Sequence, residues 1–161
     1  MTYNTSLDST AKGVTIGVTI LFASIIIGQY SIIKNTTHTT PVYTNISLLL
    51  IYFIAFAFRP INYKVSADQL IVHRLFTDIK IDRNHIESVE LLNKEKLGWT
   101  IRTFGVGGLF GYYGKFNSSA YGNMTWYATR RNKTVLIKTS NNKNIILTPD
   151  EPEKFVENLI P

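Results

Sequence analysis

Two long apolar stretches open the chain. The first covers residues 13–33 and contains no charged side chain. At 1.5 Å per residue, a helix of this length spans about 31 Å, close to the thickness of the hydrocarbon core of a bilayer. The second covers residues 41–58 and ends at Arg59 and Pro60, which supply a charge and a helix breaker. The pattern predicts two membrane-spanning helices that form a hairpin over residues 13–58.

Two other interpretations of these stretches fit the pattern less well. A helix pair buried in a soluble protein would show a polar stripe, and neither stretch has one. A cleaved signal peptide would need a shorter apolar region and a site of small residues, which residues 21–23 do not supply. Small residues stand four apart at two places in the first stretch, which permits close packing within the hairpin or between copies of the chain. These pairs are Gly13 with Gly17 and Ser24 with Gly28.

Charged residues divide the chain in the same way. Only three of them lie in residues 1–58, whereas residues 59–161 contain the other 25, a density usual for soluble domains. We therefore divide the chain into a tail (1–12), a transmembrane hairpin (13–58) and one small domain (59–161). The absence of cysteine from the sequence excludes disulfides and thiol chemistry.

Basic residues flank the two predicted spans unequally. Arg59 and Lys64 follow the second span, whereas the connection at residues 35–45 has only Lys34 beside it. Positive residues near spans favour the cytoplasmic side. We therefore expect a multi-pass protein of the inner (plasma) membrane with both termini in the cytoplasm.

From residue 61 onward, the hydrophobic pattern changes to short alternating runs separated by turn residues. Alternation of apolar and polar positions is typical of half-buried strands. We predict eight strands, at residues 61–65, 69–74, 78–82, 86–92, 99–104, 124–130, 134–139 and 144–148. Many short strands in this order indicate an antiparallel sandwich or barrel.

A helix of about ten residues is predicted to end the chain. Asp150 is a suitable N-cap, and Pro152 lies in the first turn, where its missing N–H costs nothing. Apolar residues then recur on one face, which should dock on the sheets. They are Phe155, Val156, Leu159 and Ile160. The predicted fold class is therefore α+β.

Residues 104–116 form an unusual glycine- and aromatic-rich segment. Phe110 stands where a dinucleotide-binding fingerprint requires glycine, and Phe116 stands where a P-loop requires Ser or Thr. Nucleotide binding is therefore excluded. Two interpretations stay open: a long connection between strands whose aromatic residues pack over the barrel, or a loop that touches the membrane or a partner.

No arrangement of residues typical of catalysis or metal binding is found. His38, His73 and His85 do not have the spacing of metal ligands, and no nucleophile elbow is present around Ser118 or Ser119. We therefore expect no enzymatic activity, no cofactor and no metal.

The predicted domain is mildly basic, with 15 Lys and Arg against 10 Asp and Glu in residues 59–161. These basic side chains either lie on ordinary solvated faces or contact an anionic leaflet. In the second case each Lys or Arg near the surface contributes about 1 kcal/mol of binding free energy. Tethering to a bilayer makes the leaflet a better partner than nucleic acid. The candidate lipid or partner contacts are Phe104, Leu109, Phe110, Tyr112, Tyr113, Arg130 and Arg131.

The chain resembles the membrane-anchored bacterial pleckstrin-homology (PH)-like proteins. The resemblance is carried by residues 79–92, 102–108 and 147–155, within an all-β region that ends in a helix. It implies a PH-like β-barrel of two near-orthogonal sheets closed by the C-terminal helix, no family-wide catalytic residues, and scaffold or lipid-facing roles. Eukaryotic PH domains hold phosphoinositides with basic residues around the first hairpin. Only Lys64, His73 and Arg74 are available there, so this role is not expected to carry over.

The function that we predict is that of a non-catalytic, membrane-anchored binding or scaffold module. Two alternatives stay open: a sensor of anionic lipid headgroups, and an accessory subunit of a membrane transporter or enzyme complex. The expected partners are the lipid bilayer and either a membrane protein or a second copy of the chain. Neither nucleic acid nor a small-molecule substrate is expected.

Overall fold

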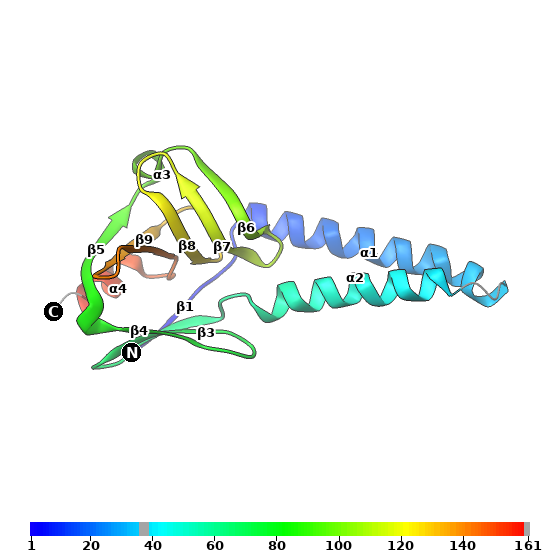
Figure 1. Ribbon diagram of the computed structural model, residues 1–161, viewed down its shortest axis with the longest axis horizontal. Coiled ribbons are helices and arrows are strands. Elements are labelled where there is room, and N and C mark those ends of the chain that lie inside the picture. The colour runs from blue at the N-terminus through cyan, green and yellow to red at the C-terminus, as the bar shows by residue number, and fades with distance from the viewer. Residues whose placement is uncertain (36–38, 160–161) are drawn as a thin grey trace.

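Two long helices project side by side from a β-domain in the computed structural model, which describes residues 1–35 and 39–159 (Figure 1). Helix α1 (Ser9–Asn35) begins four residues before the predicted span, because the Asp8 carboxylate accepts a hydrogen bond of 2.7 Å from the Ala11 N–H. Helix α2 (Thr40–Ala57) has Pro41 in its first turn and ends before Arg59. His38 lies outside the described residues.

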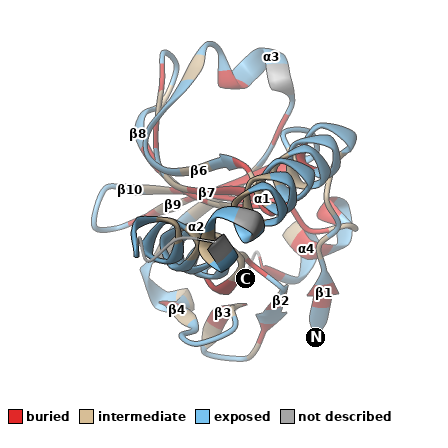
Figure 2. Ribbon diagram, turned by 90° about the vertical axis from the view of Figure 1, so that its right-hand side faces the viewer, coloured by how far each residue is buried: buried red, intermediate tan, exposed pale blue. Residues whose placement is uncertain are grey.

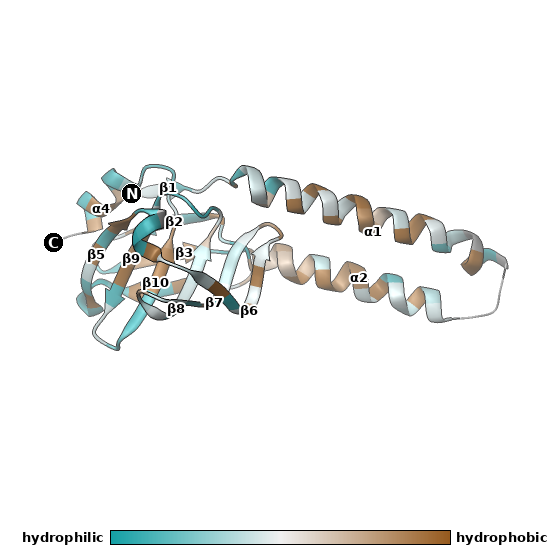
Figure 3. Cartoon of the chain, turned by 90° about the horizontal axis from the view of Figure 1, so that it is seen from above, coloured by the Kyte–Doolittle hydropathy of each residue, from teal (hydrophilic) through white to brown (hydrophobic). Residues whose placement is uncertain are grey.

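Apolar side chains on these helices are exposed along most of their length (Figures 2 and 3). Ile16, Ile20 and Ile27 of α1 are 60%, 61% and 73% exposed, and only Ala55 and Ala57 of α2 are buried. Both helices are long and apolar enough to cross a membrane, by length and composition. The core helices of a soluble protein would instead be mostly buried.

The glycines of α1 do not form the close packing within the hairpin that their spacing permits. A Cβ atom added at Gly13, Gly17 or Gly28 would have no neighbour within 4 Å. The two helices meet through larger side chains, including Phe22 and Tyr52, whose ring centroids lie 6.0 Å apart.

The smaller sheet has four antiparallel strands, in the order β1-β2-β3-β4. They are β1 (Thr2–Asn4), β2 (Asn62–Val65), β3 (Gln69–His73) and β4 (Ile79–Asp82). Strand β1 lies in the segment that sequence analysis treated as a tail, and its Tyr3 is opposite Tyr63. A strand of three residues is too short to show alternation, and both long helices separate it from its partner.

The larger sheet has six strands, in the order β5-β9-β10-β8-β7-β6. They are β5 (Ile86–Leu92), β6 (Thr100–Gly108), β7 (Gly111–Ser118), β8 (Gly122–Ala128), β9 (Thr134–Thr139) and β10 (Lys143–Leu147). Strands β8 and β10 are parallel, with Met124 opposite Asn144, so the expectation of a purely antiparallel domain is wrong. Strand β10 lies between β8 and β9 and is antiparallel to β9, which leaves it parallel to β8.

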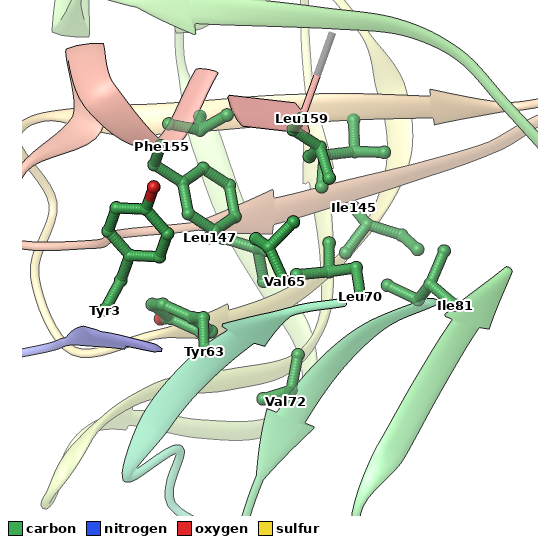
Figure 4. Close-up of a cluster of buried hydrophobic side chains, with 12 residues drawn as sticks. Tyr3, Tyr63, Val65, Leu70, Val72, Ile81, Ile145, Leu147, Phe155 and Leu159 are labelled. Atoms are coloured by element: carbon green, nitrogen blue, oxygen red, sulfur yellow. The ribbon is translucent and has the colours of Figure 1, made fainter. Parts of the chain in front are cut away.

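The main core lies between the two sheets and the terminal helix α4 (Pro152–Leu159), as Figure 4 shows. Phe155 and Leu159 are 0% and 2% exposed, which confirms that this face of the helix docks on the sheets. The ring of Tyr3 packs edge-on against Phe155 at 5.1 Å. Val156 is partly buried against the same core, and Ile160 lies outside the described residues.

Tyr63 connects the two sheets through its hydroxyl group. This hydroxyl donates to the Tyr127 carbonyl at 2.6 Å and accepts from the Thr148 N–H at 3.2 Å. Burial raises the pKa of Tyr63, so the hydroxyl stays protonated. Between the described residues, all strand pairing is within one sheet or the other, and closure into a barrel is not shown.

A second core covers the opposite face of the larger sheet, beneath the short helix α3 (Lys94–Leu97). Phe116 and Trp126 stack there with ring centroids 4.7 Å apart. A 3-10 turn, η1 (Arg83–His85), joins β4 to β5 and so connects the two sheets along the chain.

Candidate functional site: the junction between the helices and the β-domain

The glycine-rich segment is a β-hairpin, not a loop. Its two strands, β6 and β7, are paired from Thr100 with Ser118 to Gly108 with Gly111, which leaves Leu109 and Phe110 at the turn. Gly105 and Gly114 face each other and have φ of +103° and +122°, a region in which side chains are strained. Because glycine interrupts the hydrophobic alternation, sequence analysis missed β7 and ended β6 too early.

The hairpin turn is inserted between the ends of the two helices. Phe110 is only 7% exposed, and its N–H donates to the Thr15 hydroxyl of α1 at 2.9 Å. Its ring lies 5.0 Å from Tyr52 and 5.3 Å from Phe56, both on α2. Phe110 also has a φ of +58°, which is uncommon for a bulky residue and held here by these contacts.

Tyr52 and Arg59 extend this contact along α2. The Tyr52 hydroxyl lies 2.7 Å from the Thr19 hydroxyl, so the residue that touches Phe110 also joins the two helices. The Arg59 guanidinium lies 4.4 Å from the centroid of the Phe56 ring and 6.0 Å from that of Phe110. Such a cation–π contact favours a cation where the helix ends.

Two tyrosines of β7 add hydrogen bonds to the junction. The Tyr113 hydroxyl donates to the Ala55 carbonyl of α2, and burial raises the pKa of Tyr113, which keeps this donor protonated. The Tyr112 hydroxyl donates to the Asp8 carboxylate at 3.3 Å. Burial, with the nearby charge of Asp8, raises the pKa of Tyr112. The hairpin thus contacts both the start of α1 and the end of α2.

Arg130 and Arg131, expected as lipid contacts, have different environments. The Arg130 side chain is 12% exposed and bonds the Asp150 carboxylate and the Ser6 hydroxyl and carbonyl. It joins the segment before α1 to the segment before α4, so it is not free for headgroups. Arg131 is exposed, and its guanidinium lies 4.8 Å from the Tyr112 ring.

The remaining expected contact residues, Leu109 and Phe104, also have different environments in the structure. Leu109 is half-buried beside Phe110 at the hairpin turn, in the junction. Phe104 is 75% exposed on β6. Sequence analysis missed the helix residues Tyr52 and Phe56, although the aromatic-rich end of the second apolar stretch was a signal for them.

A second contact joins the domain to α2 through the loop after β3. The Leu75 N–H donates to the Ala57 carbonyl at 3.3 Å, and the Phe76 ring lies 5.8 Å from Phe53. The Arg74 guanidinium lies 5.2 Å from the Phe58 ring. Arg74 directly follows β3, at the end of the first hairpin that is away from its turn.

The junction offers aromatic surfaces, hydroxyl donors and cations. In the part of the chain that the structure describes, no group of three or more His, Cys, Asp or Glu side chains could hold a metal ion. His73 is paired with Asp78 at 2.9 Å, near the loop after β3. The arrangement is suited to holding helices and amphipathic molecules.

Replacing Phe110 with serine is expected to loosen the domain on the helices. The change removes two aromatic contacts, each worth about 0.5–1.5 kcal/mol. Because the sequence has no cysteine, spin labels can be placed at Lys34→Cys and Glu87→Cys. Pulsed electron–electron double resonance should give one narrow distribution of the distance between the two labels for the parent and a broad one for Phe110→Ser. Phe104→Ser, the same change at an exposed position, should leave the distribution narrow. Equal broadening in both variants would contradict the insertion of Phe110 between the two helices.

Comparison with known proteins identifies the β-domain. The family model described as the bacterial PH domain matches residues 61–160. A search of the curated proteins and of the solved structures found no match. The match covers more than half of the chain and confirms the resemblance seen in the sequence.

Proposed function

The chain belongs to the bacterial PH domain family, and from this premise we propose that it is a non-catalytic, membrane-anchored binding or scaffold module. Its two apolar helices would cross the inner membrane and hold the PH domain at the cytoplasmic face. Confinement to a surface raises the effective concentration of the domain toward membrane partners.

One observation carries this proposal: the domain is built from both ends of the helical hairpin. Strand β1 precedes α1 yet pairs with β2, which follows α2. If the helices span a bilayer, their domain ends therefore lie on one side of it. A cleaved signal peptide is opposed by the same pairing, because the residues before α1 form part of the sheet.

Exposed apolar surface supports the membrane location. Monomeric soluble proteins rarely expose large contiguous apolar patches, and both helices expose apolar side chains on most faces. Three hydroxyls within α1 are satisfied locally: those of Thr15, Thr19 and Ser24 donate to carbonyls four residues earlier. Such internal hydrogen bonding is what a bilayer demands of a spanning helix.

Charge supports the cytoplasmic side for the domain. The domain end of the hairpin carries Lys12, Arg59 and Arg74, whereas Lys34 is at the other end. The positive-inside bias therefore favours the cytoplasm for the domain.

Topology mapping tests the proposal. A compartment-sensitive reporter fused after Pro161 should be cytoplasmic, and one inserted at Thr39 should be extracytoplasmic, while the full chain should stay in the membrane pellet after alkaline washing. Reporters on the same side, or release by alkali, would refute the spanning hairpin. A stoichiometric polytopic protein that co-purifies with the chain would favour the accessory-subunit role.

A further inference from the structure

A pocket of about 620 Å³ lies between the end of α2, the β6–β7 hairpin, β8 and the loop after β3. Its volume is within the range of about 300–1,000 Å³ usual for ligand sites. The α2 wall includes Ile51, Ile54 and Phe58, and the β6 wall includes Phe104 and Val106. The pocket is therefore mainly apolar, and its lining includes two cations, Arg74 and Lys115, but no Asp or Glu.

The two cations keep hydrogen-bonding capacity for an anion. Lys115 donates to the Thr125 hydroxyl at 2.8 Å, which uses one of its three N–H groups. Arg74 donates to the carbonyl and the hydroxyl of Thr77, at 2.7 and 3.0 Å, which uses two of five. None of the ion pairs found between described residues involves either side chain, and the nearby Asp78 carboxylate is paired with His73.

The pocket has an apolar part and a charged part, in the same order as the acyl chains and headgroups of one leaflet of a bilayer. Its α2 wall extends from Ile51 to Phe58, about 10 Å along the helix axis, and belongs to the apolar helix. The two cations lie on the domain side, on β7 and on the loop after β3. An apolar region followed by cations is complementary to an acyl chain followed by a phosphate. Phe76 and Phe104, 66% and 75% exposed, are placed as interfacial aromatics near this site.

We propose that this pocket holds one anionic glycerophospholipid from the leaflet, with its phosphate against Arg74 and Lys115 and the upper part of an acyl chain between α2 and β6. This inference rests on the proposed membrane anchoring. Arg130 is paired with Asp150, whereas Arg74 and Lys115 are in none of the ion pairs found between described residues. The site is separate from the turn of the first hairpin.

A lipid in this pocket would also affect the junction. Tyr113 lines the pocket and donates to Ala55 of α2, so the lipid would touch the same contact that holds the domain on the helices. A ligand that binds only this docked arrangement stabilises it by mass action. The lipid composition of the leaflet would then set how firmly the domain is held.

The test is titration of the full chain in detergent with short-chain phosphatidylglycerol, followed by native mass spectrometry. We expect one bound phosphatidylglycerol per chain and at least tenfold weaker binding of phosphatidylcholine of the same chain length. Glycerol phosphate, which has the anion without the acyl chain, should not bind measurably. Equal binding of phosphatidylcholine, or equal binding of glycerol phosphate, would overturn the proposal.

Two variants localise the binding. Arg74→Gln with Lys115→Gln should weaken phosphatidylglycerol binding at least tenfold, whereas Lys64→Gln with Lys96→Gln, which removes the same charge from exposed positions elsewhere, should change it less than twofold. Equal losses in the two pairs would mean non-specific attraction and would overturn the site. Val106→Phe keeps both cations, narrows the pocket and should also weaken binding; unchanged binding in this variant would overturn the acyl-chain placement.

Folding and anchoring are measured on the same samples. An unchanged thermal melting curve without lipid shows that a variant is folded and that its lost binding is local. Suppose that the parent chain stays in the alkali-washed membrane pellet, but the Arg74→Gln, Lys115→Gln variant binds phosphatidylglycerol as tightly as the parent. This result overturns the lipid site alone. Release of the parent chain from the pellet overturns the proposed anchoring as well.

Discussion

Replacing Phe155 with aspartate is expected to unfold the β-domain at temperatures where the parent chain is folded. Phe155 is fully buried, and its ring packs at 5.1 Å from Tyr3 and 6.0 Å from Tyr63. Truncation of a buried phenylalanine alone costs about 3–5 kcal/mol, and an unpaired carboxylate in the same site costs more. Since domains of this size are stable by about 5–15 kcal/mol, most of that stability would be lost.

The measurement is thermal melting of the full chain in detergent, followed by the near-ultraviolet circular dichroism of its aromatic residues. Trp126, 2% exposed in the second core, should contribute a signal that disappears on unfolding. Glu157→Asp is the matched control, because it places the same side chain on the exposed face of α4 and should move the midpoint little. A Phe155→Asp chain with the parent's midpoint would refute the docking of α4 on the two sheets.

Replacing Gly114 with valine is expected to destabilise the domain by about 3 kcal/mol or more and to detach the hairpin turn from the helices. Gly114 has a φ of +122°, and a Cβ atom there would overlap the backbone carbonyl of Phe104 on the paired strand. Backbone cannot move aside as a flexible side chain can, so β6 and β7 would separate near the turn. Phe110, four residues away, would then lose its position between α1 and α2.

Gly122→Val provides the comparison. Gly122 also has a positive φ, +65°, but a Cβ atom there would meet nothing within 4 Å. This variant carries the backbone strain without the overlap and should cost only about 1–3 kcal/mol. Melting midpoints and the spin-label distances between positions 34 and 87 distinguish the two. Equal effects of the two substitutions would mean that the approach of β6 to β7 at Gly114 is not constrained as described.

The strands with clean alternation were predictable because their signal is local. Residues 79–82 and 134–139 are strands with the predicted ends or nearly so, and the terminal helix lies where Asp150 and Pro152 indicate. Strand β7 was missed because glycines and aromatics interrupt its pattern and most of its residues are buried on both faces. A strand without alternation has no periodicity for sequence analysis to detect.

The junction was predictable in composition but not in geometry. The sequence singled out the aromatic residues of the glycine-rich segment, yet only the structure shows that Phe110 contacts α1 and α2. Arg130 and Arg131 are adjacent in sequence and equal in charge. The structure separates them because Arg130 reaches Ser6 and Asp150, both far away along the chain.

The sequence by itself determined two apolar helices, a following β-rich domain with a terminal helix, and the absence of disulfides, because these depend on composition and on periodicities within about twenty residues. Only the tertiary structure decided that β1 completes the smaller sheet, that β8 and β10 are parallel, and that Arg74 and Lys115 face the same pocket. Each of these depends on segments that are distant in sequence and meet through packing and hydrogen bonds, and no local pattern of residues records which segments will meet.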